Sequence, residues 1–351
     1  MDKHSVKKDI PWIHLVRVLA CLMVVCQHVS TASRDYPLEH IDTAFNHVVE
    51  IFTKPCVPLF FMVTGFLILP YRNGEDIMAF YCKRIPRVWF PLLVWGVVYA
   101  VLPFLLGMTS WQAMAKEVLL SPIKQPDYFG GILWYLYILI GIYLFIPFLT
   151  DRVYENKSFL RLYLGLWIVS SLVMIIKAHV PNVFGENHWE HVFDMFLYFS
   201  GYLGFLMVGF AIRKYGAEFL MGRFMSFGGG KIKYLILLFL TLVVSYFYGS
   251  LIKSFLAIGT VVMTVNAFML LRNVDVCVEA WYYRFIKHIS GLSFGIYLCH
   301  MLVLKVLSEN IFKLIGASWV NQLLCMALTF VGAYALSWLL SKIPFKRYII
   351  G

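Results

Sequence analysis

The stretch WIHLVRVLACLMVVCQHV, residues 12–29, is apolar over almost its whole length and follows several basic residues. A helix that crosses a hydrocarbon core about 30 Å thick needs about 20 such residues. The chain is 61% hydrophobic and 14% charged, whereas soluble domains are about 25% charged. We therefore predict an integral membrane protein. Comparable runs recur at 88–106, 160–176, 234–248 and 323–340.

The spacing of the apolar runs predicts an all-α bundle of about ten transmembrane helices, forming one domain over residues 1–351. Pro55 and Pro58, at the start of the second span, predict a kinked or partly broken helix there. We expect the stretches 31–50, 107–130, 177–194 and 213–231 to lie outside the membrane. The predicted spans are 11–30, 51–70, 88–106, 131–149, 160–176, 195–212, 232–249, 253–271, 289–307 and 320–340.

The net charge of +11 follows from the membrane topology rather than from nucleic-acid binding. If the N-terminus lies in the cytoplasm, most of the 30 Lys and Arg residues fall in cytoplasmic segments, which is the positive-inside pattern. Both termini are then cytoplasmic, and we expect the lipid bilayer, but no nucleic acid, as a partner. The first apolar run is too long for a signal peptide and no small-residue cleavage site follows it, so we expect a retained helix.

Arg17 and His28 are polar residues within the first predicted span. Eleven residues make about three helical turns, or about 16 Å, so both side chains lie on one face of the helix. An arginine inside a membrane span is tolerated where it faces the protein interior or a wet cavity, which predicts a polar cavity along this face. Alternatively, the two side chains extend to the headgroups on opposite sides of the membrane.

His28 suits catalysis of acyl transfer to an alcohol, because a neutral imidazole can accept the hydroxyl proton. An acyl-imidazole intermediate is the other route, and the sequence does not separate the two. Arg84 and Arg87, at the cytoplasmic entry to the third span, project to one side of a helix. Guanidinium groups form bidentate hydrogen bonds to phosphate, which suits binding of a nucleotide. The alternative is that the two arginines only anchor the cytoplasmic end of the span, as the positive-inside rule describes.

Further polar and aromatic side chains mark the later spans. Tyr297 and His300 lie three residues apart in the ninth span, where His300 has either a functional role or a hydrogen bond to a neighbouring helix. Trp134 and Tyr137 open the fourth span, where an interfacial aromatic belt is the alternative to substrate binding.

The seven scattered cysteines predict neither disulfides nor a zinc site. The His and acidic residues of 179–194 match no familiar ligand spacing, so we predict no metal.

Several of these segments, in order, resemble the membrane acyltransferase-3 family, in particular the bacterial O-acetyltransferases that act on envelope polysaccharides. The first span carries the R-x10-H pattern of the family from Arg17 to His28. Thr64 stands in the following apolar run where Ser is usual, which keeps the hydroxyl. The matching segments are Trp12–Arg17 with His28, Val57–Phe66, Arg84-x-x-Arg87, Trp134–Tyr137 with Tyr143 and Pro147, and Ser293–His300.

The resemblance implies a multi-pass enzyme of the bacterial cytoplasmic (inner) membrane. It implies cytoplasmic acyl-CoA, most simply acetyl-CoA, as co-substrate, with no permanently bound cofactor, and a glycan or lipid-linked saccharide as acceptor. His28 and Arg17 would be the essential residues, and Arg84 and Arg87 would lie near the donor. Because the chain shows no C-terminal hydrolase-like domain of the kind that some members carry, we expect transfer to be completed within the membrane domain. We predict substrate contacts for Trp134, Tyr137, Tyr297 and His300.

A transporter or flippase of a lipid-linked sugar is the alternative from another class. In that case Arg17 and His28 would line the path of the substrate. Transporters of this kind often show internal repeats, and no convincing repeat is present. Release of free CoA separates the two hypotheses, because a transporter consumes no acyl-CoA.

Overall fold

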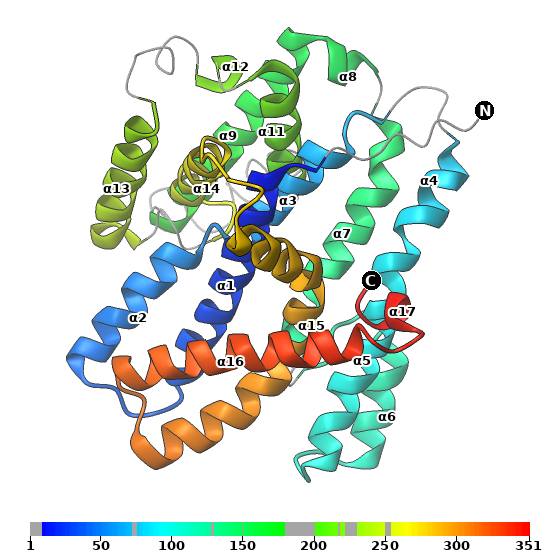
Figure 1. The fold of residues 1–351 in the computed structure, drawn as a ribbon, viewed down its shortest axis with the longest axis vertical. Coiled ribbons are helices and arrows are strands. Elements are labelled where there is room, and N and C mark those ends of the chain that lie inside the picture. The colour runs from blue at the N-terminus through cyan, green and yellow to red at the C-terminus, as the bar shows by residue number, and fades with distance from the viewer. Residues whose placement is uncertain are drawn as a thin grey trace.

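The computed structural model describes residues 9–71, 76–127, 130–149, 151–179, 201–216, 218–221, 230–249 and 254–351. Over these residues the chain is helical and contains no strand (Figure 1). The helices are α1 Pro11–Ser33, α2 His40–Thr53, α3 Cys56–Ile68, α4 Ile77–Arg84, α5 Pro86–Leu105, α6 Trp111–Leu120, α7 Trp134–Phe145, α8 Asp151–Glu155, α9 Lys157–His179, α11 Tyr202–Tyr215, α12 Glu218–Met221, α13 Ile232–Phe247, α14 Ile258–Arg272, α15 Trp281–Ile315, α16 Trp319–Leu340 and α17 Lys346–Ile349.

Within the described residues, 5 helical segments are long and apolar enough to cross a membrane. Three shorter apolar helices accompany them, at Trp134–Phe148, Ile232–Phe247 and Ile258–Arg272. The chain is therefore an all-α, multi-pass membrane protein. Every predicted span overlaps a helix, but the count of about ten and the sidedness of the termini stay predictions. The long segments are Pro11–Ser33, His40–Ile68, Ile77–Leu105, Trp281–Ile315 and Trp319–Leu340.

The second predicted span is broken, as its prolines indicated. Helix α2 ends at Thr53 and α3 begins at Cys56, with Lys54 and Pro55 between them. Within the stretch 31–50, which was predicted to lie outside the membrane, helix α2 starts at His40. Glu39 and Asp42 form a capping box at its start, which satisfies backbone N–H groups that the first turn leaves free.

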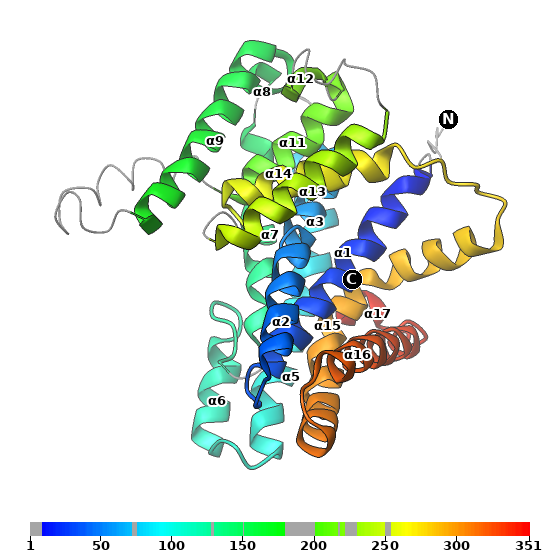
Figure 2. The ribbon, with the colours of Figure 1, turned by 90° about the vertical axis from the view of Figure 1, so that its left-hand side faces the viewer.

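Helix α1 occupies the centre of the bundle and contacts α2, α3, α14, α15 and α16 (Figures 1 and 2). Val16, Ala20 and Val24 lie four residues apart and are buried, so one face of α1 packs against its neighbours. Because α1 is surrounded by other helices, polar side chains on its packed faces lie against protein rather than lipid. This placement is what brings Arg17 and His28 into the interior.

Helices α3 and α11 approach each other closely through two glycines. A Cβ atom at Gly65 would lie 1.9 Å from the carbonyl oxygen of Leu206, and one at Gly209 would lie 2.1 Å from that of Met62. Small residues at such contacts allow helix backbones in membranes to pack closely. The guanidinium of Arg213 on α11 also donates to the carbonyl oxygen of Phe66 at 2.7 Å, near the end of α3.

We expect Gly209→Ala to destabilise the protein by about 1–3 kcal/mol, because the new methyl group meets backbone that cannot move aside cheaply. Thermal unfolding of the detergent-solubilised protein measures the effect. Gly141→Ala on α7 is the matched control, since its Cβ would meet no atom within 4 Å. Equal midpoints for the two variants would contradict the close contact between α3 and α11.

Asp9, which precedes α1, ties that helix to the start of α15. Its carboxylate accepts hydrogen bonds from His14 Nε2 and the Tyr283 hydroxyl, both at 2.8 Å, and from Lys287. The hydrogen bonds from Lys287 and His14 hold the pKa of Asp9 well below its usual value. A depressed carboxyl pKa stabilises the folded state above the unfolded pKa of about 3.9, and this contribution is lost as the pH falls below it.

We therefore expect Asp9→Asn to lower the unfolding temperature at pH 7, and to do so by a smaller amount at pH 3. The reason is that wild-type unfolded chains take up a proton on Asp9 in acid, whereas the Asn variant has no carboxylate to protonate. Thermal unfolding at the two pH values, for the wild type and the variant, measures the difference. A deficit of the same size at both pH values would show that Asp9 contributes through shape and not through charge.

Candidate active site

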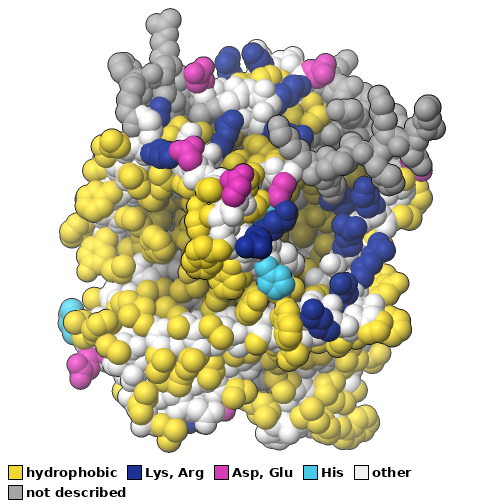
Figure 3. Space-filling model, viewed as in Figure 1, with side chains coloured by type: hydrophobic (Ala, Val, Ile, Leu, Met, Phe, Trp, Pro, Cys, Tyr) yellow, Lys and Arg dark blue, Asp and Glu magenta, His cyan; other side chains and the backbone are white. Residues whose placement is uncertain are grey.

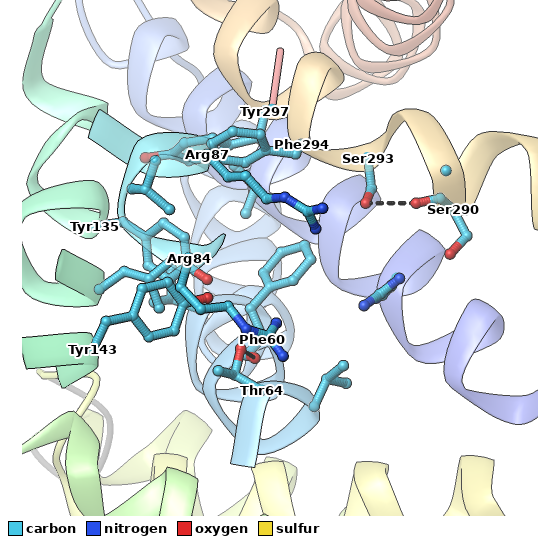
Figure 4. Close-up of a pocket in the computed structure, with 18 residues that line it drawn as sticks. Phe60, Thr64, Arg84, Arg87, Tyr135, Tyr143, Ser290, Ser293, Phe294 and Tyr297 are labelled. Carbon is cyan, nitrogen blue, oxygen red and sulfur yellow. Dashed lines mark hydrogen bonds between the residues drawn. The ribbon is translucent and has the colours of Figure 1, made fainter. Parts of the chain in front are cut away.

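Three arginines line one cavity of about 360 Å³ between α1, α3, α5, α7 and α15, which we call the arginine cavity. Arg17 comes from α1, whereas Arg84 ends α4 and Arg87 opens α5. Figure 4 shows Arg84 and Arg87 reaching into the space between Tyr143 and Ser290. In Figure 3, Lys and Arg side chains gather around a hollow in the middle of the face shown. The predicted pair of arginines and the arginine of the first span therefore share one site.

The arginine cavity carries the positive charge of three guanidinium groups. No Asp or Glu lines it. Within the described part of the chain, none of the ion pairs includes Arg17, Arg84 or Arg87. The Nε atom of Arg84 is buried and has no hydrogen-bond partner there. Buried guanidinium groups need a partner, so the cavity suits an anionic ligand with several oxygen acceptors.

His28 lines a second cavity of about 160 Å³, which we call the histidine cavity. Its walls come from α1, α3, α7 and α15 and from the segments before α7 and α14, and no charged side chain lines it. The two cavities adjoin, because Val24, Val57, Tyr135 and Tyr297 line both. Arg17 and His28 thus face two neighbouring cavities along one side of α1, and the wall between them is apolar and aromatic. The lining residues are Val24, Gln27, His28, Cys56, Val57, Ile132, Trp134, Tyr135, Phe255 and Tyr297.

Of the two residues singled out on α15, one reaches the cavities. Tyr297 lines both cavities, and its hydroxyl donates to the carbonyl oxygen of Ile132. His300 lines neither; it is fully buried next to His28, with 5.1 Å between the ring centroids. Of the predicted pair, Tyr297 therefore forms part of the cavity walls, whereas His300 lies beside His28 and lines neither cavity.

A family model described as an acyltransferase domain matches residues 10–338, almost the whole chain and all the residues above. The chain belongs to the acyltransferase-3 family. Searches of curated proteins and of solved structures gave no match. The family and the long apolar helices together make this protein a membrane acyltransferase, and the resemblance to the acyltransferase-3 family is confirmed.

In this acyltransferase-3 protein, the two predicted aromatic residues at the start of α7, Trp134 and Tyr137, lie in different surroundings. Trp134 lines the histidine cavity and stacks on Phe255, with 5.6 Å between ring centroids. Tyr137 lines neither cavity, because its hydroxyl donates to the carbonyl oxygen of Ser121 at 2.6 Å. The predicted substrate contact of Tyr137 is therefore not supported by its position.

The interior face of α7 carries residues that sequence reasoning did not select for the site. Tyr135, Leu139 and Tyr143 lie at i, i+4 and i+8 and line the arginine cavity, and this helical spacing was the signal that could have found them. Ser290 and Ser293 on α15 also line that cavity. Ser290 Oγ contacts His14 Nδ1 at 2.9 Å, and His14 also bonds to Asp9, so this contact connects the cavity to the residues around Asp9. The sequence alone could not predict this contact, because the fold brings the two residues together.

No group of three or more His, Cys, Asp or Glu side chains that could hold a metal ion occurs in the part of the chain that the structure describes. Most of the stretch 179–194, with its His and acidic residues, lies outside the described residues. The polar side chains that line the two cavities belong to arginine, histidine, serine, threonine, tyrosine, tryptophan, glutamine and cysteine residues.

We expect Arg84→Gln to weaken binding of a polyphosphate such as inorganic pyrophosphate about tenfold or more. A hydrogen bond to a charged group contributes about 1.5–3 kcal/mol, and 1.4 kcal/mol is a factor of ten. Titration calorimetry on the detergent-solubilised protein measures the dissociation constant. The matched control is Lys83→Gln, which removes the same charge from the same helix but does not line the cavity. An equal loss in both variants would assign the effect to general surface charge.

Proposed function

We propose that this membrane acyltransferase transfers an acetyl group from acetyl-CoA to a hydroxyl group of an envelope glycan or lipid-linked saccharide, at the bacterial inner membrane. One observation carries the proposal: a cavity with three arginines adjoins a cavity with His28, and the two share a wall of Val24, Val57, Tyr135 and Tyr297. An acyl-CoA molecule has the complementary layout, with phosphates at one end and a thioester at the other.

The arginine cavity supports binding of the phosphate end of the donor. Arg84 and Arg87 lack carboxylate partners in the described chain, and guanidinium groups match phosphate oxygens in geometry and charge. Arg17 belongs to the same cavity and lies about three turns, or about 16 Å, along α1 from His28. This separation favours a contact between Arg17 and donor phosphate over a role at the thioester carbonyl. The extended pantetheine arm would follow the shared apolar wall towards His28.

The histidine cavity supports the chemical step. The imidazole of His28 accepts the acceptor hydroxyl proton while that oxygen bonds to the thioester carbonyl carbon. Collapse of the tetrahedral intermediate breaks the carbon–sulfur bond, and the CoA thiolate takes the proton from the imidazolium. In the route through an acyl-imidazole, a ring nitrogen of His28 first attacks the thioester carbonyl carbon, the carbon–sulfur bond breaks, and the CoA thiolate leaves with the proton of the other ring nitrogen. The acceptor oxygen then displaces His28 from the acyl group, and its hydroxyl proton returns to the imidazole. Both routes need a neutral His28 that is open to the cavity.

The acceptor would enter beside His28 from the opposite end to the donor. Trp134 and Phe255 present aromatic surface there, and Gln27 supplies a hydrogen-bonding group. No charged side chain lines this cavity, which favours a neutral hydroxyl-bearing group such as a sugar ring. The thioester of the donor and the hydroxyl group of the acceptor would therefore meet at His28.

The test is His28→Ala in membrane vesicles supplied with radiolabelled acetyl-CoA. We expect incorporation of alkali-labile acetyl label into the glycan fraction to fall by about 100-fold or more, the scale of a lost general base, while CoA still binds. The control is His288→Ala, which changes an exposed histidine on α15. Acid-quenched mass analysis of the wild type distinguishes direct transfer from an acylated His28. Unchanged incorporation in the His28 variant would refute the proposal, and glycan movement without release of free CoA would indicate a transporter.

A further inference from the structure

His300 is a buried imidazole with no contact to either cavity. It lies in the middle of α15, which packs along α1, and its side chain is 0% exposed. Because it lines neither cavity, its position does not support the substrate contact that the sequence predicted. Its neighbour is His28, with ring centroids 5.1 Å apart and an angle of 49° between the rings.

One hydrogen bond fixes which nitrogen of His300 carries the proton. His300 Nδ1 lies 2.6 Å from the carbonyl oxygen of Tyr297. A carbonyl oxygen only accepts, so Nδ1 must be the donor, and the neutral ring then has a bare lone pair at Nε2. Nε2 is buried and has no hydrogen-bond partner among the described residues. A buried acceptor without a partner destabilises a fold by about 1–3 kcal/mol, which calls for a partner that forms in the working enzyme.

The ring of His28 is positioned to supply that partner. The 5.1 Å between the ring centroids is close to two imidazole ring radii plus one hydrogen bond of about 2.9 Å, so a nitrogen–nitrogen hydrogen bond fits this separation. The His28 ring can turn about its Cβ–Cγ bond, and this rotation exchanges the positions of ring nitrogen and carbon. No carboxylate lines the histidine cavity to orient His28 in the way that an aspartate orients a histidine in serine hydrolases.

We propose that His300 is a positioning residue for His28. Its Nε2 accepts a hydrogen bond from one N–H of His28, which leaves the other ring nitrogen of His28 unprotonated and turned towards the cavity. When His28 takes up the hydroxyl proton, both of its nitrogens carry hydrogen, and His300 accepts from one of them without itself gaining a proton. This inference rests on the proposed function, in which His28 is the base.

The test compares His300→Gln with His300→Asn. The amide oxygen of Gln can occupy the position of Nε2 and accept from His28. The shorter Asn can reach only the position of Nδ1, where its amide nitrogen donates to the Tyr297 carbonyl. Both variants carry the same polar group, so differences in folding are small. We expect the kcat for acetyl transfer of the His300→Asn variant to be about tenfold or more below that of the His300→Gln variant. The KM for acetyl-CoA should be unchanged in both variants.

Other outcomes separate this inference from the proposed function. If His28→Ala abolishes transfer while His300→Asn and His300→Gln have equal kcat values, the proposed function stands and the positioning role is refuted. If the KM for acetyl-CoA rises together with any loss of kcat, His300 acts through the donor site and the inference is also refuted. Absence of transfer from acetyl-CoA in the wild type would refute the proposed function itself. As a further measurement, His300→Leu should unfold at no lower temperature than wild type, because it removes a buried unpaired acceptor, and yet should have low kcat.

Discussion

A guanidinium and an imidazole on one membrane helix constrain the whole arrangement of this protein. A charged side chain within a span must face protein or water, so the helix that carries Arg17 and His28 cannot lie at the periphery with that face towards lipid. Helix α1 accordingly lies at the centre, and α3, α7 and α15 supply the walls of the two cavities beside it. The close packing of α3 on α11 and the attachment of α1 to α15 through Asp9 support those walls.

The two cavities differ in charge, and this difference orders the site along α1. Three arginines surround one cavity, whereas no charged side chain lines the other. An anionic group is therefore stabilised at the arginine end, while the environment of His28 favours neutral groups because a charge there would lose its hydration without gaining a partner. A substrate with a charged end and a neutral reactive end would have only one favourable orientation. Tyr135 and Tyr297 line both cavities, so the two ends of such a substrate would lie on either side of the same side chains.

The sequence predicted the features that depend on local spacing. The separation of eleven positions between Arg17 and His28 fixes a common helix face. The second span is broken at Pro55, as its prolines predicted. Prediction from the sequence failed where packing decides which face turns inward. Trp134, predicted to contact substrate, does line the histidine cavity, whereas Tyr137 bonds to the carbonyl oxygen of Ser121. The face of α7 that lines the arginine cavity runs through Tyr135 and Tyr143, which were not predicted as site residues. The contact of His14 with Ser290 joins residues 276 positions apart, and no local pattern encodes it.

The use of a second histidine, rather than a carboxylate, to orient His28 agrees with its place in the membrane. A carboxylate buried beside His28 would need partners of its own to stay charged, because burial of its charge is opposed by a desolvation penalty of several kcal/mol. A neutral imidazole supplies the same acceptor lone pair with no net charge to bury. It needs only that its other nitrogen be protonated, and the carbonyl oxygen of Tyr297 on the same helix ensures this. The backbone of α15 thus determines the tautomer of His300. His300 in turn can determine the tautomer of His28, so that the folded helix sets the protonation of the residue facing the cavity.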